Sequence, residues 1–218
     1  MKKFFLLSVL LLFSISCSSQ KEFINNDDFC DFSQNIDKVN KSLTISKEEE
    51  DLFLKGNIIL LDNDTINSVL YKHPTYKTIT NKQTNKQTNI DKMLVYEDGR
   101  LIGSYFQYIK GFLNIGMEIE YDGEGNIIKT IDHRQADKYP ICFKEAIAIA
   151  EKKKNKKDSI LSISRDSILY NKKHYYWSVY VKQPNPKNSN REGKTWSYRI
   201  DATTGKLIKK VSAEANPG

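Results

Sequence analysis

Residues 198–210 read YRIDATTGKLIKK, and this stretch decides how the end of the chain folds. The alternating run that ends at Ile200 is typical of a β-strand, and Leu207 begins a second one. Between them, Asp201 can accept hydrogen bonds from backbone amides of the turn. Gly205 supplies the positive φ angle that a β-carbon would penalise. The sequence therefore predicts a β-hairpin in which Asp201 and Gly205 are structural turn residues.

The same pattern occurs twice earlier in the chain. Residues 94–102 place an Asp-Gly pair between two alternating apolar runs, which is the strongest short-range hairpin signal. Residues 117–132, MEIEYDGEGNIIKTID, repeat the arrangement. Residues 51–136 are therefore expected to form a region rich in β-hairpins, and the three units resemble the hairpin arrays of MORN-type antitoxin proteins.

Two stretches carry little that could be buried. Residues 17–50 are polar, which indicates a tether with at most one short helix. Residues 80–89 read TNKQTNKQTN, a tandem repeat with no apolar side chain, which we interpret as a mobile loop.

The C-terminal part has the pattern of one helix followed by strands. Apolar residues at i, i+3, i+4 and i+7 share one helix face: Phe143, Ala146, Ile147 and Ala150. Residues 174–181, HYYWSVYV, alternate as a strand does, with Tyr176 and Tyr180 on the face opposite Trp177. The predicted fold class is α+β: a helix packed on an antiparallel β-meander, preceded by the hairpin-rich region.

The order of EAIAIAE, YYWSVYV and YRIDATTGKLI resembles the PepSY domain over about residues 139–211. We place this domain at residues 137–213. The family occurs in propeptides of secreted peptidases and in many bacterial envelope proteins. The resemblance implies a non-catalytic module, some relatives of which inhibit or chaperone a peptidase. Tyr176 and Tyr180 form the candidate binding face.

The first residues indicate an exported protein. Residues 1–16 have two lysines, a short apolar stretch and then small residues, which is the order of a secretory signal peptide. Ser14–Cys17 resembles the lipobox of bacterial lipoproteins, so Cys17 is the expected lipidation site and the lipid would anchor the chain to the outer membrane of a Gram-negative bacterium. Residues 18–22 resemble the surface-export signals of Bacteroidetes lipoproteins. The alternative is an ordinary signal peptide in which Cys17 is incidental.

Two further cysteines, Cys30 and Cys142, remain once Cys17 carries lipid. An even number of cysteines in an oxidising compartment favours a disulfide between them. The alternative is a pair of buried free thiols.

Charge divides the chain into unequal halves. Residues 17–139 have a net charge of −5 and residues 140–218 one of +10. The two halves could attract each other or meet different partners, while a solvated lysine surface is the simpler interpretation. Because the chain is expected outside the cytoplasm, no nucleic-acid partner is predicted.

No pattern in the sequence predicts catalysis. His73, His133 and His174 lack a second ligand at metal-binding spacing, and Asp132 and His133 would point to opposite strand faces. We therefore predict no catalytic residue, no metal and no cofactor. The predicted function is a non-catalytic exported lipoprotein that binds another envelope or secreted protein, such as a peptidase. The alternatives are a toxin-neutralising immunity protein and an uncharacterised hydrolase.

Overall fold

The computed structural model describes residues 30, 44, 52, 56–73, 75, 77–169, 173–186 and 192–213. They belong to two units. The N-terminal unit comprises Asp31–Gln135 and Leu161–Ser164, and the C-terminal unit comprises Met1–Cys30, Ala136–Ile160 and Arg165–Gly218. The predicted signal peptide, Cys17 and almost all of the predicted tether lie outside the described residues.

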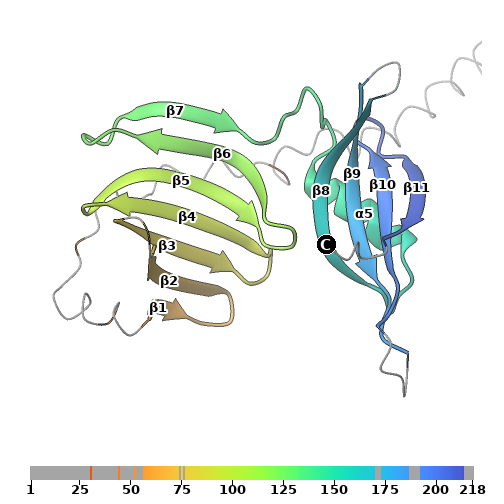
Figure 1. The fold of residues 1–218 in the computed structure, drawn as a ribbon, viewed down its shortest axis with the longest axis horizontal. Coiled ribbons are helices and arrows are strands. Elements are labelled where there is room, and N and C mark those ends of the chain that lie inside the picture. Colours follow the sequence, from red (N-terminus) through yellow and green to blue (C-terminus); the bar gives the residue numbers. More distant parts are fainter. Residues whose placement is uncertain are drawn as a thin grey trace, which may run out of the picture. The chain divides into compact units, whose positions relative to one another are not determined.

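The N-terminal unit contains one antiparallel sheet of seven strands, which lie side by side in chain order (Figure 1). Each strand pairs with the next one in the sequence. The strands are β1 (Ile58–Asp62), β2 (Ile66–Lys72), β3 (Thr78–Asn85), β4 (Ile90–Glu97), β5 (Arg100–Tyr108), β6 (Leu113–Tyr121) and β7 (Ile127–Asp132).

Both hairpins predicted in this region are confirmed. Strands β4 and β5 are joined through Asp98 and Gly99, whose φ angles are 46° and 77°. Such paired positive angles match the right-handed twist of the flanking strands. Strands β6 and β7 are joined by a turn in which Asp122 Oδ1 accepts hydrogen bonds from the backbone amides of Glu124 and Asn126, at 2.9 and 2.8 Å.

The predicted loop at residues 80–89 is wrong, because most of it is strand β3. This strand is paired on both sides, with β2 and with β4, so its backbone groups are satisfied within the sheet. Its polar side chains also find partners: Asn81 Oδ1 accepts a hydrogen bond from Ser68 Oγ at 3.1 Å. A sequence without apolar residues therefore forms a strand because its two neighbours supply the pairing.

The sheet has an apolar cluster on one face. Its members come from three adjacent strands and are at most 6% exposed: Leu94, Tyr96, Leu101, Ile119 and Tyr121. The strand register explains why these side chains share a face. Leu94 lies directly opposite Ser104, which in turn lies opposite Ile119, and residues directly opposite each other point to the same side of the sheet. Alternation along β4 puts Asp91 on the other face.

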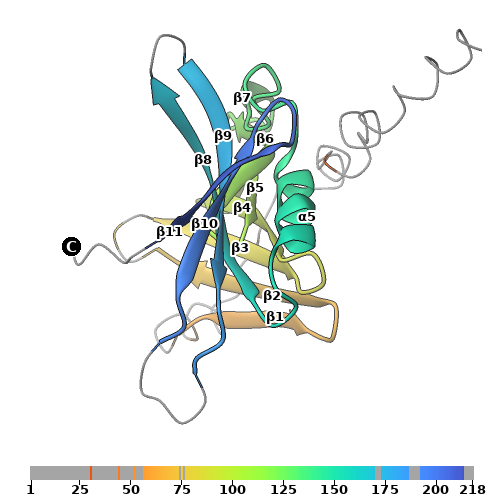
Figure 2. The same ribbon diagram turned by 90° about the vertical axis from the view of Figure 1, so that its right-hand side faces the viewer.

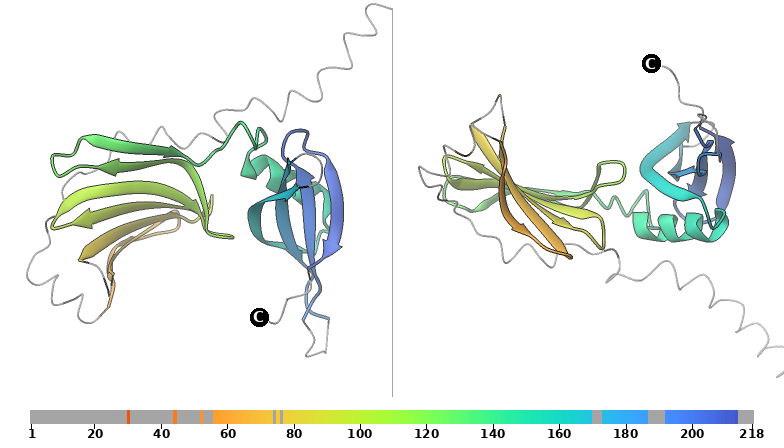
Figure 3. Two further views of the ribbon diagram at one scale, coloured as in Figure 1. Left: turned by 45° about the horizontal axis from the view of Figure 1, so that its top comes forward. Right: turned by 90° about the horizontal axis from the view of Figure 1, so that it is seen from below.

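The C-terminal unit contains helix α5 (Phe143–Lys153) and a second antiparallel sheet in the order β11-β10-β9-β8. Figure 2 shows α5 lying along one face of this sheet, and Figure 3 shows the same arrangement from two further sides. The strands are β8 (Ser159–Leu169), β9 (Lys173–Lys182), β10 (Thr195–Asp201) and β11 (Leu207–Ser212). The predicted α+β class is confirmed in this form.

Helix α5 packs through small residues. Ala146 and Ala150 are fully buried and Phe143 is buried, while Ile147 is only half-buried. Short side chains allow the helix to approach the sheet closely, and α5 contacts β9 and β10. Trp177 on β9 is 1% exposed, and its Nε1 donates a hydrogen bond of 2.8 Å to the carbonyl oxygen of Ile141. Helix and strands therefore share one interior.

Within the described part of the chain, no helix has the length and apolar character needed to cross a membrane.

Candidate functional site

The turn between β10 and β11 is held by one carboxylate. Asp201 Oδ1 accepts hydrogen bonds from the amides of Thr203 and Thr204, at 2.9 and 2.7 Å, and from Thr204 Oγ1 at 2.9 Å. Gly205 has a φ angle of +69° and donates its amide hydrogen to the carbonyl oxygen of Asp201 at 3.0 Å. His174 Nε2 lies 2.7 Å from Asp201 Oδ2. The turn thus fixes the start of β11.

These contacts set the ionisation of the Asp201 carboxyl. Burial acts to raise its pKa, but the hydrogen bonds from Thr204 and Thr203 and the neighbouring His174 outweigh burial. The pKa of Asp201 therefore lies below its ordinary value, and the carboxylate is charged at neutral pH.

Strand β11 follows this turn and is an edge strand of the sheet. Leu207 and Ile208 are 36% and 50% exposed, and Lys209 and Lys210 are also exposed. The Lys210 ammonium lies 4.6 Å from the centroid of the Trp196 ring. This distance is within the range of a cation–π contact. The edge therefore presents aliphatic and cationic side chains together.

The face bearing Tyr176 and Tyr180 is less accessible than the sequence predicts. Tyr176 is 6% exposed and Tyr180 is half-buried. The Arg199 guanidinium carbon lies 5.3 Å from the centroid of the Tyr176 ring, and burial raises the pKa of Tyr176. Because Tyr176 is already covered, it is not an open contact residue, and this part of the prediction is corrected.

In the C-terminal unit, the Tyr139 ring lies beside two other aromatic rings and an arginine. The Tyr139 ring centroid lies 5.6 Å from that of Tyr175 and 4.9 Å from that of Trp177. The Arg165 guanidinium carbon lies 5.8 Å from the Tyr139 ring and 5.2 Å from the Trp177 ring. Burial raises the pKa of Tyr139 to about 12, against the lowering effect of Arg165. Trp177 is almost fully buried, so this cluster stabilises the domain rather than offering a cage for a ligand.

The structure pairs the sulfur atoms of Cys30 and Cys142, whose Cα atoms lie 6.2 Å apart. This separation suits a disulfide. Cys142 immediately precedes α5, and its backbone amide donates a hydrogen bond of 2.8 Å to Glu145 Oε2. The sulfurs and the Glu145 carboxylate lie within 4.8 Å of one another. Paired cysteines have no thiolate to offer, so we assign no metal to this group.

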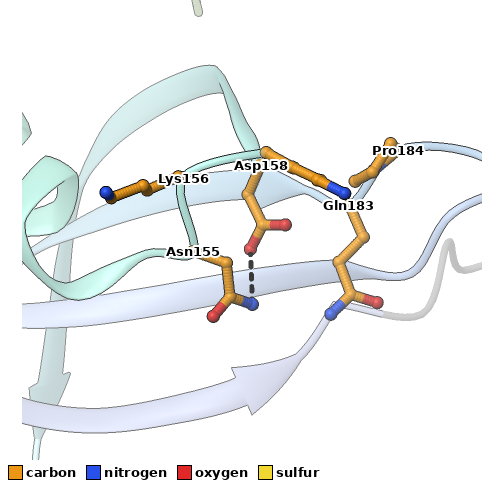
Figure 4. Close-up of a pocket in the computed structure, with 6 residues that line it drawn as sticks. Asn155, Lys156, Asp158, Gln183 and Pro184 are labelled. Carbon is orange, nitrogen blue, oxygen red and sulfur yellow. Dashed lines mark hydrogen bonds between the residues drawn. The ribbon is translucent and has the colours of Figure 1, made fainter.

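A shallow pocket of about 320 Å³ lies where α5 leads into β8, beside the end of β9 (Figure 4). Asn155 Nδ2 donates a hydrogen bond of 3.3 Å to Asp158 Oδ2, and this pair closes one side. The remaining lining residues are Lys156, Lys157, Gln183 and Pro184. Polar contacts within the wall satisfy the buried Asp158, and the arrangement has no pairing of a nucleophile with a base.

Two polar clusters in the N-terminal unit were not predicted. Asp91 is 3% exposed, and its carboxylate lies 3.1 Å from Lys82 Nζ and 2.7 Å from Thr84 Oγ1. His133 Nε2 lies 2.6 Å from Glu118 Oε2. Nε2 of His133 thus pairs with a residue of strand β6.

Such cross-strand partners could have been found only from strand register. Glu118 lies opposite Ile131, so His133 follows on the same face two residues later. The lysines on the open edge raise the same difficulty. The sequence shows Lys206, Lys209 and Lys210, but only the strand order places them at an edge strand.

A single helix on a four-stranded antiparallel meander defines a small α+β module. Residues 140–211 match the family described as Peptidase propeptide and YPEB domain. The C-terminal third of the chain is therefore a PepSY domain, as the sequence predicts. Such domains are typically non-catalytic propeptide or regulatory modules. The resemblance of the hairpins to MORN-type repeats stays a prediction.

Among solved structures, the Bacillus megaterium YpeB C-terminal domain is similar to this chain at 10% sequence identity. The match covers 80% of this chain and 100% of that domain, with a TM-score of 0.23. With a TM-score this low, we infer neither fold nor function from it. No curated protein matches the chain.

Proposed function

We propose that the protein is a non-catalytic exported lipoprotein whose PepSY domain binds another envelope or secreted protein, such as a peptidase, and modulates it. The observation that carries the proposal is the match of residues 140–211 to a family named for peptidase propeptides. Because the match covers the PepSY domain alone, we place the target in a separate protein.

The open edge of the four-stranded sheet is the physical means of binding in this proposal. A sheet edge exposes unpaired backbone groups, and an extended peptide can add to it as a further strand. Of the two edge strands, β11 has five exposed residues of six, whereas β8 is half-buried or buried at several positions. Because Tyr176 is buried, this edge is a better candidate for binding than the sheet face that carries Tyr176 and Tyr180.

Photo-crosslinking in the native host tests the binding. A photoreactive residue at Ile208, which is 50% exposed on β11, should capture one envelope or secreted protein. The matched control places the same residue at Lys152, which is exposed on α5. No capture, or the same capture from both positions, would refute the proposal. Once the captured protein is purified, its activity should differ between assays with and without the PepSY-containing chain.

The lipid anchor has its own test. Cys17 lies in the predicted lipobox, so radiolabelled palmitate should enter the wild-type protein and not the Cys17→Ala variant. The variant should leave the membrane fraction. Equal membrane retention of the two proteins would contradict lipidation at this residue.

A further inference from the structure

The edge of β11 has features that specify the chemistry of its partner. We propose that this edge binds an extended, acidic segment of the partner, which pairs with β11 as a fifth strand of the sheet. The inference rests on the proposed function, since it names the kind of segment that the PepSY domain recognises.

Backbone groups of β11 point away from the sheet at defined positions. The amide of Ala213 donates a hydrogen bond of 2.9 Å to the carbonyl oxygen of Thr195. In an antiparallel pair, hydrogen-bonded and non-hydrogen-bonded positions alternate. Ser212 and Lys210, opposite Trp196 and Tyr198, are therefore non-hydrogen-bonded, and their amide and carbonyl groups face outward. No described strand pairs with them on that side.

Cationic side chains flank these groups on both faces of the strand. Lys209 and Lys210 are consecutive, so they project to opposite faces, and Lys206 precedes the strand. All three are exposed, and none of them takes part in an ion pair with another residue of the described chain. An acidic side chain on either face of an added strand would thus lie near an ammonium group.

The same lysines disfavour a second copy of this chain as the occupant. Pairing β11 with another β11 would bring like charges together across the new interface, and lysines on edge strands oppose self-pairing for this reason. An acidic segment would avoid the repulsion between lysines of two β11 strands, and its carboxylates would attract the lysines of β11. Leu207 and Ile208, both exposed, add apolar contacts at the beginning of the strand. The expected ligand is therefore an extended segment that carries carboxylates opposite Lys209 and Lys210 and aliphatic residues opposite Leu207 and Ile208.

A binding assay with a defined probe tests the inference. The full chain is titrated into a fluorescein-labelled synthetic peptide of about eight residues in which two adjacent glutamates are flanked by valines. Anisotropy should report binding of this peptide and not of a peptide with lysine in place of glutamate. Raising the salt from about 0.05 to 0.5 M should weaken binding, because the lysines are exposed. Equal binding of the two peptides would overturn the inference.

Variants separate the backbone from the charges. Ser212→Pro removes an outward amide without removing a bond of the β10–β11 ladder, and it should lower affinity about tenfold. Lys209→Ser with Lys210→Ser should lower it at least as much. The control is Lys156→Ser with Lys157→Ser in the pocket, which should leave affinity unchanged. Urea unfolding should show that each variant is folded under the conditions of the binding assay.

Hydrogen exchange locates the peptide. The amides of Lys210 and Ser212 should become protected when the glutamate peptide binds. Protection elsewhere, or unchanged affinity in Ser212→Pro, would refute the inference at β11. If crosslinking through Ile208 still captures an envelope protein in that case, the proposed function stands and only the acidic fifth strand is wrong.

Discussion

Replacing Gly205 by alanine tests the turn that fixes β11. The residue has a φ angle of +69°, a conformation that costs an L-residue about 1–2 kcal/mol. A β-carbon there would also lie 2.8 Å from Ile141 Cδ1 and 3.0 Å from Ile149 Cδ1. Ile141 is 1% exposed and has little room to move, so crowding adds on the order of 1 kcal/mol. We expect Gly205→Ala to lower the free energy of unfolding by about 2–3 kcal/mol.

Tryptophan fluorescence during urea unfolding measures this loss selectively. The chain has two tryptophans, Trp177 and Trp196, and both lie in the C-terminal unit. The fluorescence transition therefore reports the PepSY domain. The control is Gly123→Ala in the N-terminal unit, where the nearest atom to an added β-carbon is Arg100 Nη1 at 3.4 Å. This control should leave the transition unchanged.

Two further substitutions separate the conformational cost from the crowding. Asparagine tolerates positive φ angles better than alanine does, so Gly205→Asn should retain the crowding and lose part of the conformational cost. Ile149→Val removes the Cδ1 atom and should recover part of the crowding cost when combined with Gly205→Ala. A Gly205→Ala midpoint equal to that of the wild type would refute the geometry assigned to the turn.

Three further predictions concern the same unit. In a Cys17→Ser background, the unreduced protein should not react with an alkylating agent, and two reactive thiols before reduction would contradict the bridge. The Cys30–Cys142 bridge joins residues 112 positions apart, so its reduction should lower the free energy of unfolding by about 2–5 kcal/mol. Asp201→Ala should cost roughly 2 kcal/mol at pH 7. Because the pKa of Asp201 is lowered by folding, the wild type holds this stability above about pH 3.8 and loses it as the pH falls through the folded value, so urea midpoints of the two proteins should converge in acid. The pKa of Tyr139 is raised to about 12, so the folded state resists ionisation and stability should fall as the pH rises above about 10. Tyr139→Phe should lose about 1 kcal/mol at pH 7, through its hydrogen bond to the carbonyl oxygen of Asp166, and should show less alkaline loss than the wild type.

The local patterns of the sequence determined the hairpins and the helix. Asp98-Gly99 and the Asp201 to Gly205 turn are encoded by residues that favour positive φ angles or accept bonds from nearby amides, so short-range chemistry is sufficient to predict them. The helix face of Phe143, Ala146 and Ala150 follows from its period in the same way. These features led to the PepSY resemblance, which the family match confirms over residues 140–211.

Only the tertiary structure decided which surfaces are open and which polar groups meet. The polar repeat in β3 became a strand because β2 and β4 lie on either side of it. Tyr176 faces away from Trp177 as its position predicts, yet it is covered. His133 pairs with Glu118 across a strand boundary, and β11 is an open edge because it is the last strand in the sheet order. Burial and edge position depend on contacts between residues distant in the sequence, and no local period encodes them.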